Sequence, residues 1–322
     1  MTTVVTTVDN EEALDPRSTD AYLGLLSRLS HQSVVKHFDA YADIAWDDPD
    51  FAIDPTDPRW ELSADDPLGA TSWYQALPQE QRARLGLDLV ASKMKTGLQF
   101  ESILKRGLLG FAAELPNRSA EFRYVYHEVI EEAQHALMFQ EFVNRSGYEA
   151  SGLNRWDNLS ARRIIGLGRR FPSLFFIFVL GGEDPIDHMQ RRVLRGGREL
   201  PPILERIMRI HVTEEARHLS FARHYLKRTV PGLGPFRRVA LGVGGPLILS
   251  QMAAMMMQPD RKIVRDHQIP DDVVRAAYRD NPAHRAEVTA SLRKVRQLCT
   301  DVGLLGPRYY ALWRRLGLIE PA

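Results

Sequence analysis

Two short stretches of the chain repeat one pattern of acidic and imidazole side chains. They are IEEAQHA at 130–136 and TEEARHL at 213–219. Residues three or four apart share one face of a helix, so Glu132 and His135 can bind a common ion, as can Glu215 and His218. Carboxylate oxygens and imidazole nitrogens are ligands that divalent transition metals accept. The repeat therefore indicates a metal centre built from two helices.

A third histidine extends the second copy of this pattern. His211 lies four residues before Glu215 and seven before His218, which places all three on one helical stripe. Apolar Leu219 and Ala222 follow on the same helix, as expected of a face that is buried. A buried charged side chain is unfavourable unless it is paired or coordinated. The stripe is therefore predicted to face a positive centre.

The segments around these motifs read as long helices. Four are expected, over about 78–115, 119–146, 159–181 and 200–229. A first helix is predicted over 18–42, an apolar buried helix over 239–257, and two or three shorter helices from there to about 316. No window alternates polar and apolar residues as a strand would. The fold class is thus predicted to be all-α, a helical bundle with additional C-terminal helices.

The remaining two long helices each offer one glutamate, within the first helix and directly after the second. Helical bundles that bind two metal ions take a Glu-x-x-His pair from each of two helices and one further Glu from each of the others. Glu101 is the only carboxylate between Asp88 and Glu114, and Glu183 follows the most apolar run of the chain. Both are predicted to be metal ligands.

For several residues near the predicted ligands, the sequence leaves more than one role possible. Glu131 and Glu214, the first glutamates of the two doublets, are expected to face solvent or a partner beyond the metal, and either could exchange roles with the second glutamate. Glu128 could face the same cavity, with His127 pointing beside it. His188, which lies beyond a proline, is expected at the surface or beside a metal ligand. A single Glu-x-x-His would be typical of a solvated helix, so the prediction depends on the repeat.

The ligand types favour particular metals. A site rich in carboxylate, poor in imidazole and without thiolate suits iron better than zinc or copper, and manganese is possible in place of one or both ions. Two ferrous ions held together by carboxylates can bind O2. No flavin or nicotinamide motif is present, so the electrons are expected from an external ferredoxin or reductase.

This constellation resembles the ferritin-like di-iron oxygenases of the p-aminobenzoate N-oxygenase (AurF-like) family. The residues that carry the resemblance, within about 80–300, are Glu101, Glu132-Ala-Gln-His135, Glu183 and His211-Val-Thr-Glu-Glu215-Ala-Arg-His218. The additional His211 is its most specific part. The resemblance implies a ferritin-like bundle, with Glu101 and His135 on one iron, Glu183, His211 and His218 on the other, and Glu132 and Glu215 bridging. It also implies a peroxo-diferric intermediate that transfers oxygen to an amine nitrogen.

One departure concerns the substrate. A chain that acts on p-aminobenzoate is expected to hold the ring carboxylate with a cationic or hydrogen-bonding residue one turn before Glu101. This chain has Thr96 and Gly97 there, while Lys93 lies two turns before and Lys105 one turn after. A different amine is therefore open, as is an apolar substrate. The aromatic residues that such a substrate would contact are Phe100, Phe175, Phe176 and Phe178.

Composition limits the partners and the compartment. A formal net charge of +1 gives no reason to expect nucleic acid, and a single cysteine, Cys299, excludes an intramolecular disulfide and fits the cytoplasm. Residues 1–17 are predicted to be a disordered tail without a secretory signal, and 18–322 a single domain. The 239–257 run is interrupted by glycine and proline, so membrane contact is not expected. A homodimer is possible.

Three other functions are compatible with the same residues. The first is hydroxylation or desaturation of an acyl chain, suggested by the apolar runs at 171–180 and 239–257. The second is iron binding or storage without an organic substrate, and the third is a purely structural helical protein. The leading hypothesis is an O2-dependent di-iron monooxygenase that acts on a small amine-containing metabolite.

Overall fold

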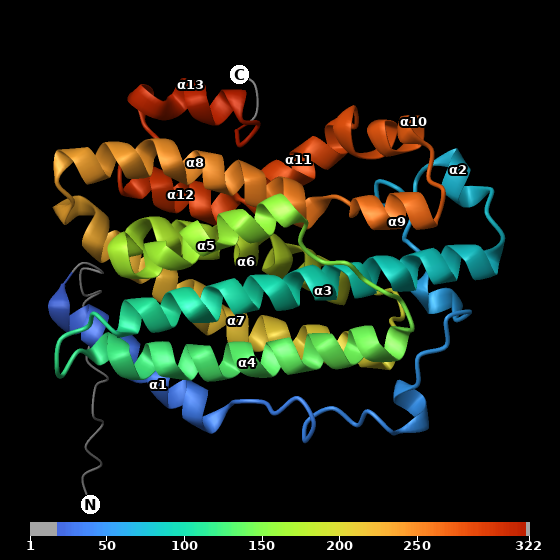
Figure 1. Ribbon diagram of the computed structural model, residues 1–322, viewed down its shortest axis with the longest axis horizontal. Coiled ribbons are helices and arrows are strands. Elements are labelled where there is room, and N and C mark those ends of the chain that lie inside the picture. Colours follow the sequence, from blue (N-terminus) through green and yellow to red (C-terminus); the bar gives the residue numbers. More distant parts are fainter. Residues whose placement is uncertain (1–17, 320–322) are drawn as a thin grey trace, which may run out of the picture.

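The computed structural model describes residues 18–319, which contain helices and connections and no strand (Figure 1). The long helices are α1 (Thr19–Val35), α3 (Gln79–Ala112), α4 (Ala120–Ser146), α5 (Arg155–Arg170), α6 (Pro172–Arg195), α7 (Pro202–Thr229) and α8 (Pro235–Met257). The short ones are α2 (Ser72–Gln75), α9 (Arg261–Asp266), α10 (Asp271–Val274), α11 (Pro282–Ser291), α12 (Arg293–Asp301) and α13 (Pro307–Arg315). Single turns lie at Pro49–Phe51, Pro58–Trp60 and Val230–Gly232, and a π-helical turn at Arg275–Arg279. The all-α prediction is confirmed.

Four helices, α3, α4, α6 and α7, form the central bundle. The helix α3 packs against α4, and α6 packs against α7. The helix α1 covers the bundle beside α4, while α8 covers the opposite side, over α5 and α6, together with α11, α12 and α13 (Figure 1). The helix α9 packs against α3 instead. This is the predicted ferritin-like bundle with additional C-terminal helices.

Two apolar clusters fill the bundle, one toward each end. On α4, Tyr124 and Val125 belong to the first cluster and Met138 and Phe139 to the second. The helix α7 is divided in the same way. Its buried apolar residues from Leu219 onward belong to the first cluster, and those up to Ile210 belong to the second. The buried glutamates, histidines and arginine of α4 and α7 lie between these clusters. The fold therefore places its polar belt in the middle of the bundle, with apolar packing on both sides.

For the first helix, the predicted start is confirmed and the predicted end is wrong. The Ser18 hydroxyl accepts a hydrogen bond from the Ala21 N–H, as an N-cap does. The helix ends at Val35 rather than near 42. The next backbone groups bond to the bundle instead, since the Phe38 N–H donates to the Glu214 carboxylate and the Ala40 N–H to the Gln134 side chain.

The predicted helix over 159–181 is wrong as a single element. The chain breaks at Phe171, whose backbone is not helical, and Pro172 starts α6 because a proline fits the first turn of a helix. The helix α6 then continues through Pro185 to Arg195. Glu183 is therefore a mid-helix residue. Pro185 cannot donate to the carbonyl four residues earlier, so α6 lacks one backbone hydrogen bond beside Glu183.

The apolar run at 239–257 belongs to α8 and packs against α6 and α13. The stretch Pro235–Asp266 is long and apolar enough to cross a membrane by length and composition, and 44% of its most apolar window is buried inside the protein. Gly242 lies where an added Cβ would overlap the ring of Tyr309. Helix α8 thus serves as a covering layer of the bundle. The predicted tail, 1–17, lies outside the described residues, and the single-domain assignment stays a prediction.

Candidate metal centre

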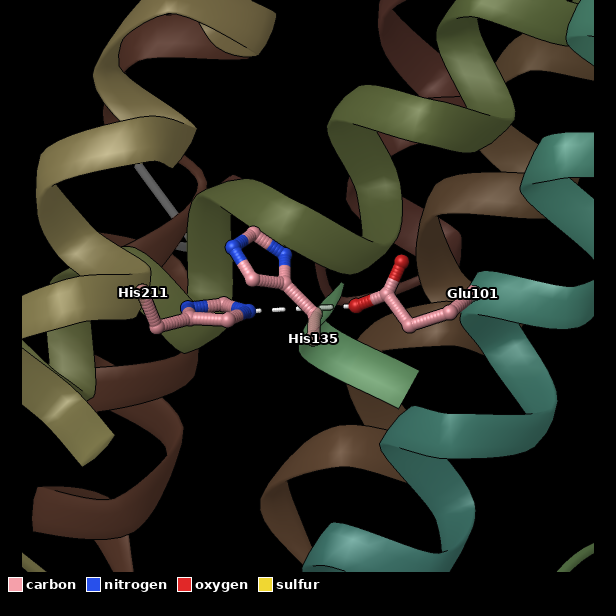
Figure 2. A group of neighbouring side chains, drawn as sticks. All are labelled: Glu101, His135 and His211. Atoms are coloured by element: carbon pink, nitrogen blue, oxygen red, sulfur yellow. Dashed lines mark ion pairs between the residues drawn. The ribbon is translucent and has the colours of Figure 1, made fainter. Parts of the chain in front are cut away.

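The seven residues predicted from the sequence converge in the middle of the bundle. Glu101 comes from α3, Glu132 and His135 from α4, Glu183 from α6, and His211, Glu215 and His218 from α7. All seven are at most 2% exposed. Groups of three have ligand atoms within 4.8 Å of one another: Glu101, His135 and His211 (Figure 2); Glu132, His135 and Glu215; Glu183, His211 and Glu215. All four central helices thus contribute to one buried cluster.

Two of the histidines turn the same nitrogen toward this cluster. The Nδ1 atom of His135 lies 3.1 Å from Glu132 Oε2 and 3.5 Å from Glu215 Oε1. The Nδ1 atom of His218 lies 3.0 Å from Glu132 Oε1 and 3.0 Å from Glu215 Oε1. Glu132 and Glu215 therefore lie between the two imidazoles, and each carboxylate is close to both Nδ1 atoms.

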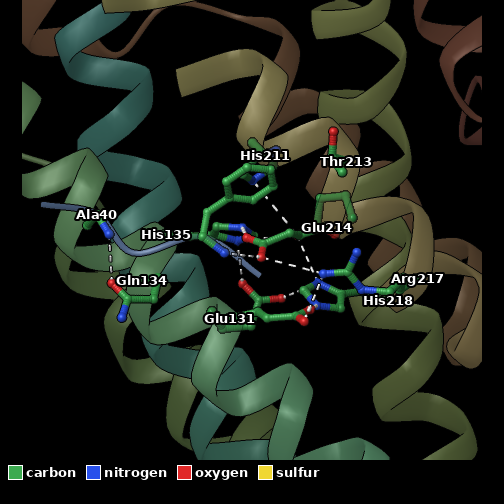
Figure 3. A network of polar contacts seen from close by, with 12 residues as sticks. Ala40, Glu131, Gln134, His135, His211, Thr213, Glu214, Arg217 and His218 are labelled. Atoms are coloured by element: carbon green, nitrogen blue, oxygen red, sulfur yellow. Dashed lines mark hydrogen bonds and ion pairs between the residues drawn. The ribbon is translucent and has the colours of Figure 1, made fainter. Parts of the chain in front are cut away.

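The other imidazole nitrogens are held by the first glutamates of the doublets, each across the bundle (Figure 3). His135 on α4 bonds through Nε2 to Glu214 on α7 at 2.9 Å, and His218 on α7 bonds through Nε2 to Glu131 on α4 at 2.8 Å. Glu131 and Glu214 are 2% and 0% exposed, so the solvent-facing alternative is wrong. A carboxylate on Nε2 fixes the ring orientation and leaves Nδ1 free to bind a metal.

A buried arginine joins these outer carboxylates. Arg217 Nη2 donates to Glu131 Oε1 at 2.8 Å and lies 3.5 Å from Glu214 Oε1. Burial would raise the pKa of Glu131, but His218 and Arg217 lower that pKa to about 2. Glu131 is therefore an ionised acceptor for His218. Nothing in the sequence pattern indicated this role of Arg217, although it occupies the variable position of the second doublet motif.

His211 is oriented differently from the other two histidines. Its Nε2 atom points into the cluster, 3.8 Å from Glu101 Oε1 and 3.9 Å from Glu215 Oε1. Its Nδ1 atom lies 2.9 Å from the Gln190 side-chain oxygen on α6. Burial, helped by the charge of His135, holds the pKa of His211 well below its usual range, so the imidazole is neutral, the form that binds metals. Sequence reasoning missed Gln190, which no motif marks.

The cluster has the properties of a site that needs a cation. Burial raises the pKa of Glu101, Glu183 and Glu215. One buried oxygen of Glu101, of Glu132 and of Glu215 makes no hydrogen bond. Several buried carboxylates that face one another with fewer donors than oxygens are unfavourable, and divalent metal ions supply the missing charge. The residues present therefore fit a dinuclear carboxylate-bridged metal centre.

Other sequence candidates lie outside the cluster or beside it. His188 bonds to Glu287 at 3.0 Å on a half-buried surface, as expected. The Lys105 ammonium donates a hydrogen bond to the backbone carbonyl of Glu132 at 2.8 Å. Gly97 lies against the ring of Phe139. The predicted aromatic residues of α3 and α6 pack on one another, as in the Phe100 and Phe178 rings 4.9 Å apart.

A narrow surface hollow lies beside His135, between α4, α7 and the chain that follows α1, and it has no room for a water molecule. The residues that line it are Phe38, Asp39, Ala40, Gln134, His135, Met138 and Ile210. The segment after α1 therefore packs closely over this side of the cluster.

The sequence also matches known proteins. Curated relatives in Mycobacterium bovis and Mycobacterium tuberculosis, both named as uncharacterized proteins, are 41% identical over 293 residues, which is 91% of this chain and 86% of theirs. Residues 19–303 match the family described as p-aminobenzoate N-oxygenase AurF, and this range contains the whole cluster. The chain belongs to the p-aminobenzoate N-oxygenase AurF family.

Proposed function

We propose that this protein is a non-haem di-iron monooxygenase that uses O2 to oxidise the nitrogen of a small amine-containing metabolite. Its family is one of oxygenases, which supports an oxidoreductase. The observation that carries the proposal is the buried cluster of four carboxylates and three histidines, with carboxylate oxygens left without donors. A structural helical core gains nothing from such a cluster, because unpaired buried carboxylates oppose folding.

We assign the ligands as the family resemblance implies. Glu101 and His135 would hold one iron, and Glu183, His211 and His218 the other. Glu132 and Glu215 would hold both ions, in line with their closeness to the Nδ1 atoms of both His135 and His218. Carboxylate-rich coordination favours iron, and manganese could replace one or both ions.

The bound ions would reduce O2 and deliver an oxygen atom to the substrate, with electrons from an external ferredoxin or reductase. The protein residues set the conditions for this chemistry. The apolar clusters on both sides exclude water from the site. Glu131 and Glu214, tied by Arg217, hold two imidazoles in the orientation that binds metal. Orientation and exclusion of water are therefore contributions of this chain rather than of the metal.

The substrate is proposed to be an amine other than p-aminobenzoate. One turn before Glu101 the chain has Gly97, which faces the ring of Phe139 and offers no cation. Lys105, the nearest lysine on the other side of Glu101, already donates to the Glu132 backbone. Thr96, beside Gly97, already donates its hydroxyl to the Ser92 carbonyl, so these positions offer a ring carboxylate no free donor. The protein is proposed to act in the cytoplasm, which fits its single, buried cysteine.

Replacing His211 with alanine tests the proposal. We expect the His211→Ala variant to keep its helix content and to lose at least ~100-fold in amine oxidation, because a metal ligand is removed. His224→Ala is the matched control, since His224 lies on the same helix and bonds only to the Ser220 carbonyl. Activity is measured by mass spectrometry on a panel of amines and acyl thioesters. Full turnover by His211→Ala, or oxidation of acyl chains alone, would contradict the proposal.

A homodimer is proposed on the outer face of α4. Phe122, Tyr126, Ile130 and Leu137 are 47%, 42%, 56% and 45% exposed, and they follow one another at helical spacing. An exposed apolar stripe on one helix can pair with its own copy about a twofold axis. We expect Ile130→Glu to elute as a monomer in size-exclusion chromatography while Tyr310→Glu, on distant α13, elutes with the unmodified protein. Identical elution of all three would argue against this interface.

A further inference from the structure

Glu128 is a buried carboxylate without a hydrogen-bond partner. It lies on α4 one turn before Glu132, and it is 0% exposed. Neither of its oxygens makes a hydrogen bond, and no other carboxylate of residues 18–319 has both oxygens buried and unpaired. The Tyr124 hydroxyl, one turn earlier on the same helix, is also without a partner, so it does not serve Glu128. The helix therefore carries a carboxylate for which the folded protein provides no donor.

Glu128 lies beside two residues of the proposed metal cluster. An oxygen of Glu128, an oxygen of Glu132 and a nitrogen of His218 lie within 4.8 Å of one another. Burial and the neighbouring carboxylates of Glu132, Glu215 and Glu131 disfavour a negative charge on Glu128. His218 favours that charge, but this imidazole is already engaged by the same three carboxylates. The buried Arg217 is engaged by Glu131 and Glu214. No protein cation close to Glu128 is free to balance it in the part of the chain that the structure describes.

We infer that Glu128 is a further ligand of the ion bound by His218. This inference rests on the proposed dinuclear centre and adds a fifth carboxylate to it. A metal ion beside His218 supplies the positive charge that the packing around Glu128 lacks, and carboxylate oxygen is a preferred ligand of iron and manganese. Because Glu128 and Glu132 are four residues apart, both carboxylates reach the same side of the cluster from consecutive turns.

The alternative is that Glu128 has only a structural role. A structural carboxylate is held by donors, as Glu131 is by Arg217 and His218, and Glu128 has none. Its replacement by the isosteric neutral Gln is therefore expected to leave the metal-free protein at least as stable, because one charge is removed from a group of carboxylates. A metal-ligand role predicts instead that metal binding weakens.

Anaerobic titration with Fe(II) separates these roles. We expect the unmodified protein and a Glu121→Gln control on the same helix to bind two ions with the same affinities. Glu128→Gln should bind one ion normally and the other at least ~10-fold more weakly. Mössbauer spectra of the 57Fe(II) forms should show a change in one of the two iron sites. Glu128→Asp keeps the charge but shortens the side chain, and it should weaken the same ion.

The outcomes distinguish the two proposals. Equal affinities and unchanged Mössbauer spectra in both Glu128 variants would overturn the ligand role while leaving the dinuclear centre intact. Failure of the unmodified protein to bind iron would overturn the dinuclear centre itself. Circular dichroism and the Tm of the metal-free proteins show whether a variant is folded. If Glu128→Gln does not fold, Glu128→Asp decides: weaker binding of one ion supports the inference, and normal binding overturns it.

Discussion

Removing the carboxylate of Glu132 or of Glu215 is expected to abolish the metal pair. Each lies between the Nδ1 atoms of His135 and His218, at 3.0 to 3.5 Å, so each is close to ligands of both proposed ions. In the Glu132→Ala and Glu215→Ala variants we expect at most one iron per chain and at least a ~100-fold loss of amine oxidation. Iron content by emission spectroscopy and product formation are the measurements.

The matched control for these variants is Glu205→Ala. Glu205 lies on α7, as Glu215 does, but it forms an ion pair with Arg209 that is partly exposed. Such a pair within a helix stabilises folding by only about 0.3–0.5 kcal/mol. Its loss should leave iron content and activity unchanged. Two irons per chain in Glu132→Ala or Glu215→Ala would show that the bridging assignment is wrong.

Replacing Arg217 with methionine is expected to have the largest effect on stability. Arg217 is 5% exposed and bonds to Glu131 while lying close to Glu214. Without it two buried carboxylates lose their shared cation, and breaking a buried ion pair in this way costs about 3–5 kcal/mol. Metal affinity should fall too, because Glu131 and Glu214 orient His218 and His135. Urea unfolding of the metal-free protein and Fe(II) titration measure the two effects.

Arg217→Lys serves as the conservative comparison. A lysine keeps the positive charge but loses the planar group that donates to two carboxylates, so we expect stability between that of the unmodified protein and Arg217→Met. Arg209→Met, at a half-exposed position of the same helix, should change stability by no more than about 1 kcal/mol. If Arg217→Met were as stable and bound iron as tightly as the unmodified protein, the contacts of Arg217 with Glu131 and Glu214 would contribute neither to stability nor to metal binding.

The repeat of two doublets is explained by the way they cross. Helical spacing was enough to predict that Glu132 and His135 share a face, as do Glu215 and His218, and the structure brings these residues together. Spacing could not predict the partners of Glu131 and Glu214, because each bonds to a histidine of the opposite helix. The first glutamate of each doublet therefore orients the histidine of the other copy, and the second faces the metal cluster.

For the fold too, local features could be predicted from the sequence and tertiary contacts could not. The periodicity of α3, α4 and α7 is local, so their extents were predicted within a few residues. The break at Phe171 and the passage of α6 through Pro185 depend on tertiary packing. Gly182, beside Glu183, lies where an added Cβ would overlap the ring of Phe100, so α6 approaches α3 closely at this point. That contact fixes the position of α6 next to Glu183. It joins residues far apart in the sequence, so local sequence patterns do not predict it.

Anaerobic loading of the metal-free protein with Fe(II), followed by admission of O2, tests the central claim most directly. Bound iron is counted per chain, and the visible spectrum is recorded as O2 enters. The proposed centre predicts two irons per chain and a new absorption band that depends on O2 and decays when a substrate amine is added. Iron well below two per chain, with no band that depends on O2, would contradict a dinuclear O2-activating site.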